Sequence, residues 1–355
     1  MAWDVAERVA RRVARRTDIR IDWVTHSRLV SDFDEFTAEA EALVEQSTGL
    51  RSQVGPARAQ VASREAWIHA NISSFRRLLG PLLERAGKSG RSLPGVLGPA
   101  GRTAAGAEMG LVLGWMSGRV LGQYDLLLAE GGDSAQDAVY FVGPNIVSLE
   151  RRHGFAPREF RLWIALHELT HRAQFTGVPW MRAHFLDLVE RSVAIASPDP
   201  RQVMDALGRM AVDIRYGRNP LAESGIVGAL ASPDQLETLR SIQGMMSLLE
   251  GHGDVTMDRA ALDLIPSAGH FSRVLRARRE SASGVTKFLQ QLIGLEAKLR
   301  QYADGERFVR EIERTGGPEL LALAWQGPEN LPSAAEIQAP DRWASRVRGL
   351  SLEPA

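Results

Sequence analysis

The pentapeptide His167-Glu168-Leu169-Thr170-His171 constrains this chain of 355 residues more than any other segment. On a helix, histidines four residues apart share one face, and both imidazoles can bind one ion at ordinary zinc–nitrogen distances. Glu168 lies about 100° around such a helix, so its carboxylate flanks the ion, where a general base must stand. The residues Trp163–Leu166 are apolar. We therefore predict a helix over residues 157–175 that is buried in the core and presents its ligand face to a cleft.

A third metal ligand has to be found elsewhere, and the absence of cysteine limits the choice to His, Asp and Glu. Position 177 is glycine, which excludes a short-spaced third histidine, and His184 follows the helix break at that glycine. Glu250 and Asp254 are four residues apart on a predicted helix with apolar positions before them, and acids in a core helix seldom lack a partner. We expect Glu250 to be the third ligand and Asp254 to accept the free N–H of a ligand imidazole. An exposed acidic edge is the alternative for this pair.

The rest of the chain is predicted to be mostly helical. The clearest strand signal covers residues 138–149, where Val, Tyr, Phe and Ile concentrate around a break at Gly143-Pro144, so we expect a bent strand or two short strands. Five glycines four residues apart between Gly106 and Gly122 predict a helix that another backbone approaches closely. The other helices are expected near the N-terminus and over residues 31–48, 57–79, 180–194, 200–212, 235–261 and 285–302.

Charge and hydropathy exclude several classes of partner. Lys plus Arg and Asp plus Glu both total 43, and this balance argues against nucleic acid as the main partner. The longest apolar stretch, residues 109–128, is interrupted by charged and polar side chains that a bilayer would penalise. The arginine-rich N-terminus lacks the apolar segment of a signal peptide, so a cytoplasmic location is expected. Oligomeric state leaves no signal in the sequence.

The motif followed by a distant helix with Glu250 and Asp254 resembles the gluzincin metallopeptidases, of which thermolysin is a member. The runs LHELTHRAQF, LLEGHGDVTMD and YFVGPNIV are similar to an actinobacterial family of zinc-dependent metalloproteases or hydrolases, which is also associated with biosynthesis of the deazaflavin coenzyme. The resemblance implies one zinc ion on His167, His171 and Glu250, Glu168 as the general base, and Asp254 as the hydrogen-bond partner of a ligand histidine. It also implies an edge strand along Tyr140, Val142 and Asn145 on which a peptide lies.

The fold class that follows is mainly α with α+β character. A zincin-like catalytic core over residues 106–305 would hold a small sheet or edge strand before the motif helix, surrounded by helices. Residues 1–105 would form an N-terminal helical region, and residues 306–355 a C-terminal helix and proline-rich tail in the same compact unit.

The expected activity is hydrolysis of a peptide or small amide by water that Glu168 deprotonates. Tyr216 and His270 are possible donors to the tetrahedral oxyanion, and Tyr140 and His252 are less favoured. Two other functions remain open, because the motif is compatible with them: a zinc-stabilised binding or scaffold protein without turnover, and a hydrolase of a non-peptide amide in cofactor metabolism.

Overall fold

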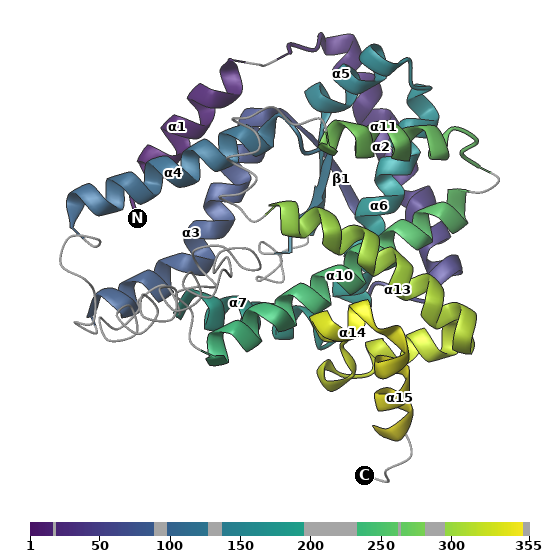
Figure 1. Cartoon of the computed structure of the whole chain (residues 1–355). Helices are drawn as coiled ribbons and strands as arrows, with labels where there is room; N and C mark the ends of the chain where they lie inside the picture. Colours follow the sequence, from purple (N-terminus) through teal and green to yellow (C-terminus); the bar gives the residue numbers. More distant parts are fainter. Residues whose placement is uncertain are drawn as a thin grey trace. The chain divides into compact units, whose positions relative to one another are not determined.

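The computed structural model describes residues 1–16, 19–88, 98–126, 137–194, 233–261, 264–280 and 295–350 (Figure 1). The chain divides into two compact units, one formed by Met1–Gly177 and Thr256–Ser281 and the other by Val178–Val255 and Ala282–Ala355. The predicted helix over residues 200–212 and the candidate Tyr216 lie outside the described residues. Among the described helices, none has the length and apolar character needed to cross a membrane.

The first unit combines a small sheet with helices. Its elements are α1 (Trp3–Arg15), α2 (Trp23–Thr48), β1 (Arg58–Ala62), α3 (Arg64–Lys88), α4 (Pro99–Ser117), β2 (Gly122–Tyr124), β3 (Ala138–Val142), α5 (Gly143–His153), α6 (Pro157–Gly177) and α11 (Ala268–Glu280). The described part of the chain is therefore mostly helical with a small three-stranded sheet, which confirms the predicted fold class.

The sheet has the order β1-β3-β2, with β1 parallel and β2 antiparallel to β3. β3 therefore has neighbours on both sides and is the central strand, and the expectation of an edge strand there is wrong. The strand also ends at Val142, because Gly143 and Pro144 form the first turn of α5. Proline is favoured in that position, where its missing N–H costs no helical hydrogen bond.

α1 and α4 pack closely through small residues (Figure 1). A Cβ added to Gly114 would lie 2.7 Å from the carbonyl oxygen of Ala10, and Gly106 and Gly110 face the backbone of α1 in the same way. This confirms the close helix packing predicted from the glycine spacing. The predicted continuation of that helix is wrong, since α4 ends at Ser117 and Gly122 lies in β2.

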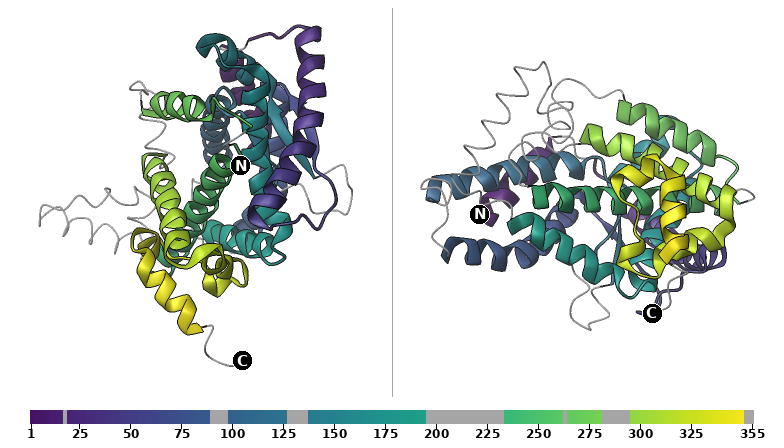
Figure 2. Two further views of the ribbon diagram at one scale, coloured as in Figure 1. Left: turned by 90° about the vertical axis from the view of Figure 1, so that its right-hand side faces the viewer. Right: turned by 60° about the horizontal axis from the view of Figure 1, so that its bottom comes forward.

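α2 lies along α6, as Figure 2 shows from two further sides. It begins after the N-cap Asp22, whose carboxylate accepts from the N–H of Thr25, so the expected start near Ser31 is wrong. It ends at Thr48, as predicted, and the next residue, Gly49, adopts a left-handed conformation with φ 71°. The segment predicted as a helix over residues 57–79 is instead β1 followed by α3.

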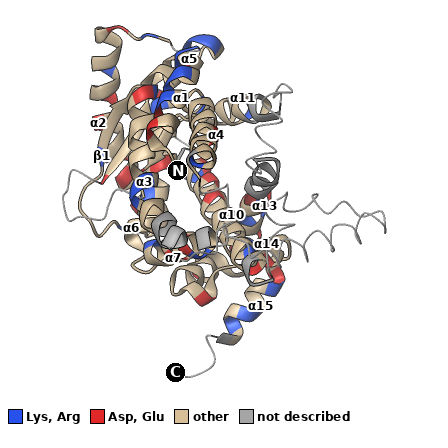
Figure 3. Cartoon of the chain, turned by 90° about the vertical axis from the view of Figure 1, so that its left-hand side faces the viewer, with Lys and Arg blue, Asp and Glu red and all other residues tan. Residues whose placement is uncertain are grey.

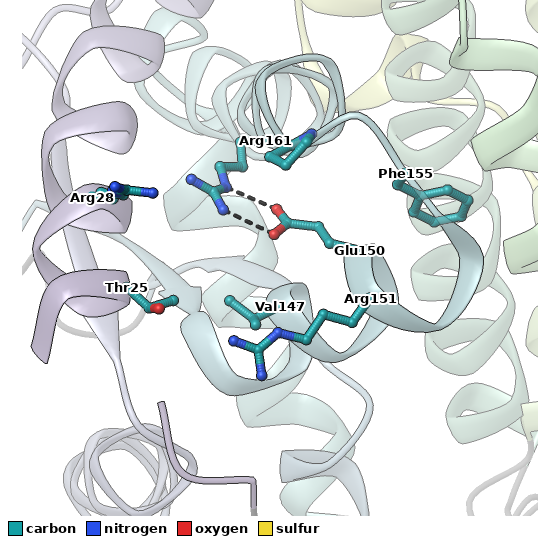
Figure 4. A pocket seen from close by; sticks show the side chains of 8 residues that line it. Thr25, Arg28, Val147, Glu150, Arg151, Phe155 and Arg161 are labelled. Carbon is teal, nitrogen blue, oxygen red and sulfur yellow. Dashed lines mark hydrogen bonds and ion pairs between the residues drawn. The ribbon is translucent and has the colours of Figure 1, made fainter. Parts of the chain in front are cut away.

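A buried ion pair joins α6 to the end of α5, a helix whose last turn is basic (Figure 3). The Nε and Nη2 atoms of Arg161 donate to the two carboxylate oxygens of Glu150, each at 2.8 Å, beside a cavity of about 280 Å³ (Figure 4). Its Nη1 atom donates to Asp32 of α2 at 2.5 Å. One guanidinium thus connects three helices.

Arg172, three turns further along α6, connects the other end of this helix to neighbouring segments in a similar way. Its side chain is 1% exposed, and its Nη1 atom donates to Glu41 of α2 at 2.5 Å. Its Nε atom donates to Asp137 at 3.0 Å, just before β3, and its Nη2 atom to the carbonyl oxygen of Gly55. These bonds fix α6 against both α2 and the segments that lead into the sheet.

The second unit is helical in its described part. It contains α7 (Met181–Ala194), most of α10 (Pro233–Ala261), α13 (Leu295–Ala322), α14 (Ala334–Gln338) and α15 (Pro340–Leu350), with two short 3-10 helices before α14. Its core groups Leu248 and Val255 of α10 with Phe308 and Ile312 of α13 and Trp343 of α15. Helices were predicted over residues 180–194, 235–261 and 285–302. The first two are confirmed; of the third, residues 285–294 lie outside the described residues and residues 295–302 belong to α13.

Candidate metal centre

α6 carries the two histidines of the motif, as predicted. Pro157 is the first residue of the helix and Gly177 is the last. Glu159 lies in the first turn, where the helix dipole favours an acidic side chain. Trp163–Leu166 are buried, whereas His167 and His171 are each partly exposed. The helix is thus buried along most of its surface and presents its imidazoles at a less covered face.

The two imidazoles converge through their Nε2 atoms, which lie 3.2 Å apart with the ring planes at 84°. Two nitrogens that bind one zinc ion at about 2.0–2.1 Å with a tetrahedral angle are about 3.3–3.4 Å apart. The observed separation fits two ligands of a single ion.

Gln174 contacts the Nδ1 side of the His171 imidazole. Its Oε1 atom lies 3.0 Å from Nδ1 of His171, and its side chain is completely buried. An amide oxygen only accepts, so Nδ1 of His171 donates in this contact, and in the neutral imidazole Nε2 then keeps its lone pair for a metal. Sequence reasoning missed this residue, although its position three after His171 places it on the same helix face.

Glu168 is buried, with 8% of its surface exposed, and lies against Gly122 of β2. A Cβ on that glycine would come within 2.5 Å of Cγ and 2.7 Å of Oε1 of Glu168. The glycine therefore leaves the space that the carboxylate occupies next to the histidines. No pattern in the sequence indicates this contact, because 46 residues separate the two positions.

Glu250 and Asp254 lie on α10, in the second unit. His167, His171 and Glu250 form a group of side chains that could hold a metal ion. They provide two imidazoles and one carboxylate, a set of donors that zinc accepts in catalytic sites with one position left for water or substrate.

Two of the residues expected along a substrate strand, Val142 and Asn145, make structural contacts. Val142 is fully buried in the core between β3 and the neighbouring helices. Asn145 belongs to α5, and both ends of its buried amide are used: Nδ2 donates to the carbonyl oxygens of Ser117 and Val120, and Oδ1 accepts from Arg64. Tyr140 lies in the central strand, where burial and the nearby Asp125 raise the pKa of its phenol. In the described residues, β2 is the strand beside Glu168 and it is paired on one side only.

The structure does not bring His270 to the histidine pair. It lies on α11, exposed, with its ring 5.4 Å from that of Phe155 before the start of α6. At 1.5 Å per residue, His167 is about 15 Å further along the axis of α6 than Pro157. His252, which was a less favoured candidate for the oxyanion donor, packs against Trp325 within the second unit.

Comparison with known proteins adds two findings. The sequence matches the model of a zincin-like metallopeptidase family over residues 1–344. It is also similar to a crystal structure from Chloroflexus aurantiacus described as "a putative hydrolase with a novel fold", with 30% identity, complete coverage of both chains and a TM-score of 0.72. No curated protein sequence matches the chain.

Proposed function

Because the chain belongs to the zincin-like metallopeptidase family, we propose that it is a zinc-dependent peptidase whose ion is held by His167, His171 and Glu250. The observation that carries the proposal is the 3.2 Å approach of the two Nε2 atoms beside a buried glutamate on the same helix. A zinc ion held there would polarise the scissile carbonyl and lower the pKa of water toward ~7.

Glu168 is the general base in this proposal. Its carboxylate follows His167 directly and is confined by Gly122, so it stands beside the imidazoles without pointing along them. It accepts a proton from the attacking water and passes that proton to the nitrogen of the leaving amine. Its burial favours this role, because a carboxylate shielded from solvent keeps its position and exchanges protons with the substrate instead of bulk water.

The substrate strand in this proposal is β2 and not β3. β2 adjoins Glu168 at Gly122 and is the last strand in the sheet order of the described residues, a position at which an extended peptide could add to the sheet by backbone hydrogen bonds. A small non-peptide amide, such as a precursor in deazaflavin coenzyme metabolism, is the alternative substrate, since the same attack on an amide carbonyl applies.

The test combines metal analysis with an unbiased peptide-library digest, with and without a chelator. We expect one zinc per chain and cleavage that a chelator abolishes and zinc restores. Glu168→Gln should keep the zinc and lose cleavage, whereas Glu35→Gln, a change at an exposed glutamate of α2, should alter neither. One zinc per chain without cleavage of peptides or amides would support the scaffold function instead. Zinc-free protein with full activity would refute the proposal.

A further inference from the structure

His167, His171 and Gln174 lie on one stripe of α6. At 100° per residue, His171 is rotated by about 40° and Gln174 by about 20° in the opposite sense from His167, so the three side chains fall within about 60°. All three belong to one helix and one compact unit. The stripe brings together two candidate ligands and the acceptor that fixes the proton of one of them.

We propose that Gln174 is a positioning residue that fixes the tautomer and ring orientation of His171, so that α6 alone builds the histidine half of the metal site. The inference rests on the proposed function, since it needs His171 to be a metal ligand. The amide of Gln174 is completely buried and its oxygen is 3.0 Å from Nδ1, so the acceptor is held in place by packing. The role expected for Asp254 is therefore already filled at His171 by a residue on the same helix.

The type of acceptor at position 174 determines how zinc affinity should change on substitution. A neutral amide oxygen orients the imidazole but draws the Nδ1 proton less strongly than a carboxylate does, so it raises the basicity of Nε2 less. A side chain without an acceptor would remove the hydrogen bond to Nδ1 of His171 and would free the ring to rotate. Loss of such an outer partner typically weakens metal binding 10- to 100-fold.

The experiment measures the zinc dissociation constant by competition with a chromophoric chelator, using the full chain. Gln174→Met keeps the length of the side chain and removes the acceptor, and we expect zinc binding about 10- to 100-fold weaker. Gln174→Glu restores an acceptor and should bind zinc at least as tightly as the wild type. Thr176→Val is the matched control: it removes a buried hydroxyl of α6 that donates to the carbonyl oxygen of Arg172, and it should leave zinc affinity unchanged.

The same comparison in a Glu250→Ala background tests whether α6 builds its half of the site alone. The fold-loss caused by Gln174→Met should persist there, because the change acts on His171 and not on the carboxylate ligand. Two results would overturn this inference and leave the proposed function standing, provided that the wild type binds zinc. One is an unchanged zinc affinity in Gln174→Met. The other is a loss of zinc affinity in Gln174→Glu as large as that in Gln174→Met. A wild-type chain that binds no zinc would overturn the proposed function and this inference with it.

Discussion

Replacing Gly122 by alanine should separate catalysis from metal binding. The added Cβ would lie 2.5 Å from Cγ and 2.8 Å from Cδ of Glu168, whereas carbon atoms in ordinary contact are about 3.5–4.0 Å apart. The glutamate must therefore move by about 1 Å or more. The backbone of Gly122 does not have a positive φ, so alanine itself is tolerated at this position.

The expected consequence is a loss of turnover with little loss of stability. A displacement of about 1 Å in a catalytic group costs roughly 100-fold in rate, or ~2.7 kcal/mol of activation free energy. Because the clash is with a side chain that can rotate, the fold and the histidine pair should be retained. The assay is kcat on the best peptide from the library digest, measured together with zinc content and the urea midpoint.

Two comparisons make the result specific to Glu168. Gly349→Ala in α15 introduces a Cβ with no atom within 4 Å and should leave activity unchanged. Combining Gly122→Ala with Glu168→Gln should reduce turnover no further than Glu168→Gln alone, because both changes remove the same function. If Gly122→Ala keeps kcat within threefold of the wild type at equal zinc content, the assignment of Glu168 as a base confined by β2 is refuted.

Three further predictions concern stability. Arg172→Met leaves two carboxylates without their buried cation and should lower the free energy of unfolding by about 3 kcal/mol in urea titrations; a change below about 1 kcal/mol would contradict the assigned role. Gly251→Ala places a Cβ against the backbone of α13 and should destabilise the chain by about 1–3 kcal/mol, whereas Gly349→Ala in α15 should be neutral or stabilising by up to ~1 kcal/mol. Burial alone would raise the pKa of Glu336, but hydrogen bonds from Arg346 and Ser333 outweigh it and lower the pKa from 4.5. The stabilisation from Glu336 is therefore present above about pH 4.5 and lost as the pH falls through the lowered pKa, so the difference between wild type and Glu336→Gln should disappear in acid; a difference independent of pH would refute it.

The sequence predicts α6 and α10 well because long helices carry both a period and end signals, such as Pro157 and Gly177 around the motif. It does not predict β1. The segment Arg58–Ala62 consists of Arg, Ala, Gln and Val, several of which favour helices, and it is a strand because it pairs with β3. β2 has only three residues and depends on the same pairing. Strand pairing is a long-range interaction, so a local pattern cannot contain it.

The candidate site likewise has a part that the sequence predicts and a part that it does not. The spacing of His167 and His171 predicts their approach, because one helix defines it, and Gln174 could have been found by the same rule. The edge strand could not be predicted from YFVGPNIV alone, since that run has the composition of a buried strand and its place in the sheet depends on β1 and β2. The contact between Gly122 and Glu168 depends on the path of the chain from α4 into the sheet.

The arginines of α6 connect the fold to the site. Arg161 and Arg172 are eleven residues apart and so lie within about 20° of each other around the helix, whereas His171 is about 100° away from Arg172. A buried ion pair is weak evidence for stability, because the desolvation of both partners offsets much of the attraction, but it penalises any arrangement that leaves either charge unpaired. Rotating α6 by one residue would withdraw both guanidiniums from four carboxylates, which lie on α2, on α5 and directly before β3. The two arginines therefore specify the rotation of α6, and through it the direction in which both imidazoles and Gln174 point.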